Sequence, residues 1–182
     1  MPEELIVRYC APTLAGLKTG SMFSCPFSDE GQLREFVRGC NRAVSAKGLR
    51  LLPLRYENGR ALVYLYRPSC LLRDLQNGEA RRLLLEQGYD VEHPACCIPR
   101  LIRRLRESDA FPHEVGLFLG YPPEDVRGFI EGKARCKCVG CLKVYGDAEA
   151  AQRLFCKYKK CTQIYCALFS QGSSIERLAV AG

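Results

Sequence analysis

An Asn-Gly pair at positions 58 and 59 constrains the fold of this chain more than any other feature of its sequence. The pair separates two runs rich in β-favouring residues, 49–56 and 60–67. Both central residues of a tight hairpin turn need positive φ, which Asn and Gly adopt most readily. The sequence therefore predicts a β-hairpin over 49–67, with Pro53 placing its first run at a sheet edge or at a bulge.

The remaining patterns predict the elements that surround this hairpin. Apolar residues occupy both alternation phases of the second run, so we expect both faces of the sheet to be covered. Further strands are expected at 5–9 and 142–145, with an edge strand at 175–180. Apolar residues at helical spacing predict helices within 28–47, 68–88, 94–106, 111–132 and after Asp147. Together these elements predict a single α+β domain over 1–182, with a small mixed sheet built on the hairpin and covered by helices.

Twelve cysteines in 182 residues raise the question of their redox state. The N-terminal residues have no basic region followed by a long apolar run, as a secretory signal would. No stretch approaches the roughly 20 apolar residues of a membrane span. We therefore expect a cytoplasmic protein with reduced thiols. These thiols would act as core residues, metal ligands or reactive groups.

The stretch 111–166 concentrates turn signals, thiols and positive charge. Cys136, Cys138 and Cys141 lie in a glycine-containing segment, where their sulfurs could converge on zinc or on part of an iron–sulfur cluster. No second paired motif completes such a site, so a fourth ligand would come from Cys161, Cys166 or His113. Cys161, on an apolar helical stripe like Cys40, is expected to be buried. A thiol-based metal or redox site in the 136–141 loop is the first functional hypothesis.

The net charge of +7 indicates an acidic partner. An acidic protein or another polyanion would dock on basic residues around the thiol-rich loop. No aromatic-interleaved basic motif of a known nucleic-acid reader is present, so nucleic acid is the weaker alternative. The candidate partner-binding residues are Lys133, Arg135, Lys137, Lys143, Lys157, Lys159 and Lys160.

A third hypothesis is a cysteine-dependent enzyme. Pro12 would let a helix begin just after Cys10, and a thiol near a helix N-terminus is shifted toward thiolate. The alternative is a small buried side chain at the end of a strand, since free cysteines are among the most buried residues. His113 and Glu114 follow Pro112 in an expected first helical turn, where they form an acid/base pair or cap the helix. The candidate catalytic residues are Cys10, Lys18, His113 and Glu114.

Four tracts, at 10–18, 111–130, 143–147 and 158–162, carry a resemblance that extends over nearly the whole chain. On these tracts the chain resembles an uncharacterised family of small cysteine-rich cytosolic proteins of anaerobic Gram-positive bacteria. The resemblance implies a shared fold and setting, with a flavodoxin as an example of the acidic protein partner. It implies no reaction.

Overall fold

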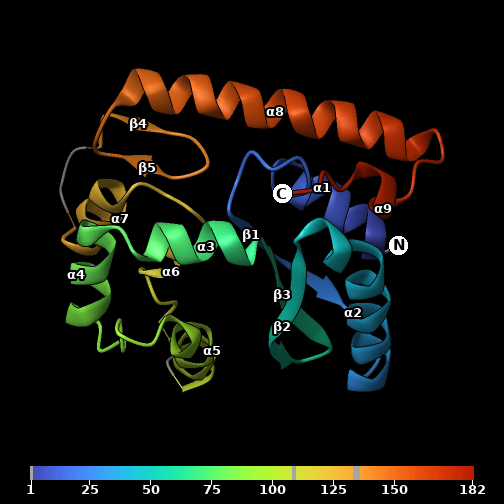
Figure 1. The fold of residues 1–182 in the computed structure, drawn as a ribbon, viewed down its shortest axis with the longest axis horizontal. Coiled ribbons are helices and arrows are strands. Elements are labelled where there is room, and N and C mark those ends of the chain that lie inside the picture. Colours follow the sequence, from blue (N-terminus) through green and yellow to red (C-terminus); the bar gives the residue numbers. More distant parts are fainter. Residues whose placement is uncertain (1, 108–109, 133–135) are drawn as a thin grey trace. The chain divides into compact units, whose positions relative to one another are not determined.

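The computed structural model describes residues 2–107, 110–132 and 136–182, which divide into two compact units (Figure 1). Unit 1 contains residues 1–69 and 158–182, and unit 2 contains residues 70–157. Helices and small antiparallel sheets confirm the predicted α+β class. The single-domain organisation stays a prediction.

A three-stranded antiparallel sheet forms the centre of unit 1. Its strands β1 (Gly20–Pro26), β2 (Arg50–Glu57) and β3 (Arg60–Tyr66) are arranged in the order β1-β3-β2. The predicted hairpin is confirmed, because Asn58 and Gly59 join β2 to β3 with φ of 50° and 72°. Pro53 lies on an edge strand beside a β-bulge, as expected.

One face of this sheet packs against α1 (Pro2–Leu14), α2 (Glu30–Val44) and α9 (Ile175–Leu178). Alternate β3 residues, Val63 among them, join one apolar cluster with side chains of all three helices. On the opposite face Tyr64 and Tyr66 stack with their ring centroids 4.7 Å apart. Both faces of β3 are therefore buried, as its two apolar phases predicted.

Two of the predicted strands are wrong, and a third is a strand but belongs to a different sheet from the one expected. Residues 5–9 belong to α1, where Ile6, Val7, Cys10 and Leu14 recur at helical spacing and are buried in the unit 1 core. Residues 175–178 form α9, which Ser174 caps by accepting a hydrogen bond from the Arg177 N–H. Residues 143–144 form β5, which pairs with β4 in a separate sheet and does not join the hairpin.

Arg67, at the end of β3, ties together segments of unit 1 that are distant in sequence. Its side chain is buried and donates to the carbonyls of Thr13 (2.9 Å) and Leu14 (2.8 Å), at the C-terminal end of α1. It also donates to the carbonyl of Val180 at 2.8 Å. A guanidinium at a helix C-terminus satisfies carbonyls that have no partner within the helix and complements the helix dipole.

Unit 2 consists mainly of short helices and one two-stranded sheet. Its buried side chains include Leu84, Leu101 and Phe118. No helix in the described part of the chain is long and apolar enough to cross a membrane. The elements are α3 (Pro68–Leu75), which starts just before the unit, α4 (Gly78–Glu86), η2 (Pro94–Cys96), α5 (Cys97–Glu107), α6 (Val115–Phe118), α7 (Pro123–Ile130), β4 (Cys138–Val139) and β5 (Lys143–Val144). The first part of α8 (Ala148–Ser170) also belongs to unit 2. In unit 1, the short 3-10 helix η1 (Ser45–Lys47) follows α2.

Candidate functional site

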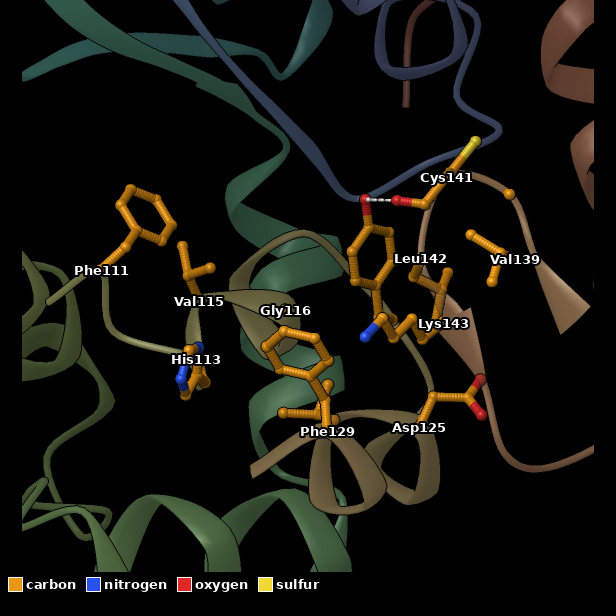
Figure 2. Close-up of a pocket in the computed structure, with 13 residues that line it drawn as sticks. Phe111, His113, Val115, Gly116, Asp125, Phe129, Val139, Cys141, Leu142 and Lys143 are labelled. Carbon is orange, nitrogen blue, oxygen red and sulfur yellow. Dashed lines mark hydrogen bonds between the residues drawn. The ribbon is translucent and has the colours of Figure 1, made fainter. Parts of the chain in front are cut away.

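A cavity of about 480 Å³ lies within unit 2, between the segment that carries α6 and α7 and the turn between β4 and β5 (Figure 2). Its walls are mostly apolar, and four of its lining residues have polar or charged side chains that matter for its chemistry: His113, Tyr121, Asp125 and Lys143. The other lining residues are Phe111, Val115, Gly116, Val126, Phe129, Val139, Gly140, Cys141 and Leu142. The cavity thus falls inside the 111–166 stretch.

Phe129 brings two nitrogen-bearing side chains to this cavity. The His113 ring packs edge-on against the Phe129 ring, with the centroids 4.8 Å apart. The Lys143 Nζ lies 5.5 Å from the same ring centroid, in a cation–π contact. His113 and Lys143 were both predicted as site residues, and the structure brings them to one cavity.

Asp125, in the first turn of α7, lines the cavity but directs its charge elsewhere. Its carboxylate is buried, and a single oxygen, Oδ1, accepts from the backbone N–H groups of Tyr145 (2.6 Å) and Gly146 (2.9 Å). Figure 2 shows this carboxylate turned away from Phe129 and His113. Asp125 therefore fixes the segment after β5 against α7.

Tyr121 connects the α6–α7 turn to the β4–β5 turn. Its hydroxyl donates to the Cys141 carbonyl at 3.3 Å. Burial, and to a smaller extent the Cys141 thiol, raises the pKa of Tyr121 to about 12, so the phenol stays neutral at ordinary pH.

The helix start expected just after Cys10, on which its predicted catalytic role depended, is not found. Cys10 lies near the end of α1, not at a helix start, and is completely buried in the unit 1 core. Desolvation raises its pKa far above the ordinary thiol value, and the opposing effect of Lys18 is smaller. The alternative of a packing cysteine fits this environment. His113 lies in the other unit, and Lys18 is half-buried after α1.

Glu114 is a structural residue in the described fold. Its buried carboxylate accepts the Tyr89 hydroxyl at 2.9 Å. Arg104 Nε lies 2.6 Å from the same oxygen in an ion pair, although its N–H is not aligned for a hydrogen bond. Burial, followed by Glu114, raises the pKa of Tyr89 well above its usual range. Glu114 is thus separated in role from its neighbour His113, which is exposed.

The three thiols of the 136–141 loop do not form a cluster with shared ligand geometry. Among the residues that the structure describes, no group of three or more His, Cys, Asp or Glu side chains is close enough to hold a metal ion. Cys136 and Cys138 are half-buried and Cys141 is exposed, whereas Cys40 and Cys161 are buried as expected. Cys166, one of the expected fourth ligands, is half-buried. This arrangement of thiols does not support the predicted zinc or iron–sulfur site.

The predicted basic residues have different local surroundings. The Lys137 amine donates to the Gly146 carbonyl at 2.7 Å, and Lys143 lines the cavity. Lys157, Lys159 and Lys160 are exposed along α8. Lys133 and Arg135 lie outside the described residues. A shared partner surface stays a prediction.

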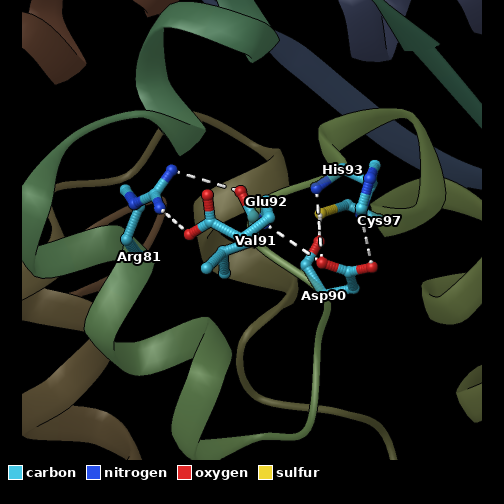
Figure 3. Close-up of polar contacts among 6 residues, drawn as sticks. All are labelled: Arg81, Asp90, Val91, Glu92, His93 and Cys97. Carbon is cyan, nitrogen blue, oxygen red and sulfur yellow. Dashed lines mark hydrogen bonds and ion pairs between the residues drawn. The ribbon is translucent and has the colours of Figure 1, made fainter.

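A second polar cluster, at residues 90–93, is local structure (Figure 3). Asp90 Oδ1 accepts from the backbone N–H groups of Glu92 and His93, and its Oδ2 lies 2.8 Å from His93 Nδ1. The His93 contact is the main reason that the pKa of Asp90 is lowered. Arg81 binds Glu92 and the Val91 carbonyl, so these groups satisfy one another and shape the turn before α5.

The comparison with known families agrees with the extent of the resemblance. Residues 6–179 match the model of the family described as "Protein of unknown function (DUF3793)". The chain belongs to this family. The DUF3793 match includes every residue that lines the cavity, together with the cores of both units. No curated protein and no solved structure matches the chain.

Proposed function

We propose that unit 2 is a binding module for a small, mainly apolar molecule that occupies the cavity. Small-molecule sites are typically concave, about 300–1,000 Å³ in volume, mostly apolar, and supplied with a few polar groups that orient the ligand. The cavity, at about 480 Å³, has this size and composition.

Apolar side chains exposed around the cavity are the observation that carries this proposal. Phe111 is 48% exposed, Phe129 40% and Val139 70%, and all three line the same cavity. Single exposed apolar residues are common, whereas a group around a concavity marks an interaction site. Burying these rings against a ligand would remove apolar surface from water, which is the main driving force for such binding.

Protein-observed NMR with 2-naphthamide, a neutral aromatic probe, tests the proposal. We expect the amide signals of residues 111–129 and 139–143 to shift saturably. Phe129→Ala should weaken binding about tenfold, since an aromatic contact contributes about 0.5–1.5 kcal/mol beyond the area that it buries. Leu85→Ala truncates an exposed apolar side chain of α4 outside the cavity and should leave binding unchanged. Shifts confined to other residues, or equal binding by both variants, would overturn the proposal.

A second candidate function is docking of an acidic protein on α8. Lys159 and Lys160 are exposed, and no carboxylate among the described residues lies within ion-pair distance of either amine. Unneutralised surface cations attract acidic partners at long range and do so less at high salt.

Binding of poly-L-glutamate at increasing salt concentrations tests this second function. We expect Lys159→Glu with Lys160→Glu to weaken binding and flatten its salt dependence. The same charge change at Arg38 and Arg42, exposed on α2, is the matched control and should have the smaller effect. Equal effects of the two double variants would reduce the interaction to net charge alone.

A further inference from the structure

Lys143 places a positive charge at the cavity that is not paired with a carboxylate among the described residues. Lys143 is exposed on β5, and its amine contacts the Phe129 ring face. Within the described residues, no carboxylate lies within ion-pair distance of that amine. A cation–π contact of this kind stabilises an amine by about 0.5–1 kcal/mol at an exposed site and leaves its other N–H donors available.

Negative charge from the cavity wall does not neutralise Lys143. Asp125 is the acidic residue among the described lining residues, and its Oδ1 is already bound by two backbone N–H groups. The first turn of α7 also favours its negative charge, because the helix dipole is positive there. Tyr121 is a neutral phenol whose hydroxyl donates to a carbonyl.

His113 adds a second nitrogen group beside the same aromatic ring. Its ring is exposed, and it has no hydrogen-bond partner in the part of the chain that the structure describes. An imidazole N–H donates well to a carboxylate. Lys143 and His113 both contact the Phe129 ring. They therefore place hydrogen-bond donors next to the apolar rings that line the cavity.

We infer that the ligand of this cavity is a small aromatic carboxylic acid, whose ring contacts the apolar wall and whose carboxylate binds the Lys143 amine with help from His113. This inference rests on the proposed binding function of unit 2. The apolar part of the ligand replaces water over Phe111, Phe129 and Val139. The carboxylate gains a charge-assisted hydrogen bond, which is stronger than a bond between neutral groups.

The test compares 2-naphthoate with 2-naphthamide, which share the ring system and differ in charge. We expect the wild-type protein to bind the carboxylate about tenfold more tightly, a difference that corresponds to about 1.4 kcal/mol. Lys143→Gln should abolish this preference, because it weakens the binding of 2-naphthoate far more than the binding of 2-naphthamide. Lys157→Gln removes an exposed lysine of α8 that does not line the cavity, and it should retain the preference.

The outcomes separate the inference from the function on which it rests. If neither probe binds, the small-molecule function itself is overturned. Equal binding of both probes by the wild-type protein leaves that function standing and rejects the carboxylic acid. A preference that survives in Lys143→Gln rejects Lys143 as the group that recognises the anion. Circular dichroism of both variants confirms that the fold is intact, since both substitutions are at exposed residues.

Discussion

Asp125 allows a test of how the cavity wall is held together, because one of its oxygens binds two backbone N–H groups. Asp125→Asn keeps a carbonyl oxygen in the place of Oδ1, so both hydrogen bonds, from Tyr145 and Gly146, can persist without the charge. Asp125→Ala removes both bonds. The two substitutions therefore separate the contribution of charge from the contribution of hydrogen bonding.

The expected losses of stability follow from the geometry. Hydrogen bonds to charged groups contribute about 1.5–3 kcal/mol each and neutral ones about 0.5–1.5, so the two bonds together lose about 2–3 kcal/mol in Asp125→Asn. A neutral amide costs less to bury than a carboxylate, so we expect a net loss of about 1–2 kcal/mol in the free energy of unfolding. Asp125→Ala leaves two donors without an acceptor, at about 1–3 kcal/mol each. Tyr145 and Gly146 are half-buried, and water offsets part of this cost, so we expect about 3 kcal/mol.

Urea unfolding followed by far-ultraviolet circular dichroism measures both free energies. Asp147→Ala is the control, because the exposed Asp147 Oδ1 accepts from the Ala150 N–H at 3.0 Å and its loss should cost about 1 kcal/mol. If Asp125→Asn costs as much as Asp125→Ala, the retained oxygen does not preserve the bonds. If Asp125→Ala costs no more than the control, Asp125 does not fix the segment after β5, and the reasoning fails.

Three other predictions concern particular packing and buried groups. Gly128→Ala in α7 should lower the free energy of unfolding by about 1–3 kcal/mol, because the added Cβ would lie 2.5 Å from the Tyr145 side chain. The added Cβ of Gly39→Ala in α2 meets no described atom within 4 Å, so this variant should raise the free energy of unfolding by up to about 1 kcal/mol. Thermal unfolding measures both changes. Arg67→Lys should lower the free energy of unfolding in urea by about 2–4 kcal/mol, since one ammonium cannot reach all the carbonyls that the guanidinium binds. An unchanged urea midpoint would contradict this role of Arg67. Burial raises the pKa of Cys25 to about 11. The buried neutral thiol of Cys25 therefore makes its full contribution to the free energy of unfolding below about pH 9, and this contribution is lost as pH rises through 11. Iodoacetamide labelling, read by mass spectrometry at pH 8, should be about 100-fold slower at this thiol in the native protein than in urea, and equal rates would refute its burial.

The hairpin could be predicted because its signal is local. Asn58 and Gly59 specify the turn through their own backbone preferences, and no distant contact is needed. The N-terminal segment was predicted wrongly because Leu5, Ile6 and Val7 favour strands individually, whereas burial against α2, α9 and the sheet decides the outcome. Strand β1 was missed for a related reason, since it ends at Pro26 and depends on pairing with β3.

The candidate site was predicted only in its components. His113 and Lys143 were singled out for their chemistry, whereas Phe129, whose ring contacts both side chains, was not among the candidate site residues. The cavity arises from two segments separated in the chain, 111–129 and 139–143, and their apposition is a tertiary property. The ion pair of Glu114 with Arg104 could not be predicted, because the two residues are brought together only by the tertiary fold.

The order of the two units along the chain has a consequence for biosynthesis. Unit 2 is continuous, whereas unit 1 is made from residues 1–69 and 158–182, so unit 2 is inserted within unit 1. A ribosome completes the β1–β3 sheet long before it delivers Ile175 and Leu178, which belong to the same apolar cluster. During that interval the surface that α9 later covers is open to chaperones and to other nascent chains. All residues of unit 2, by contrast, are synthesised before the last segment of unit 1.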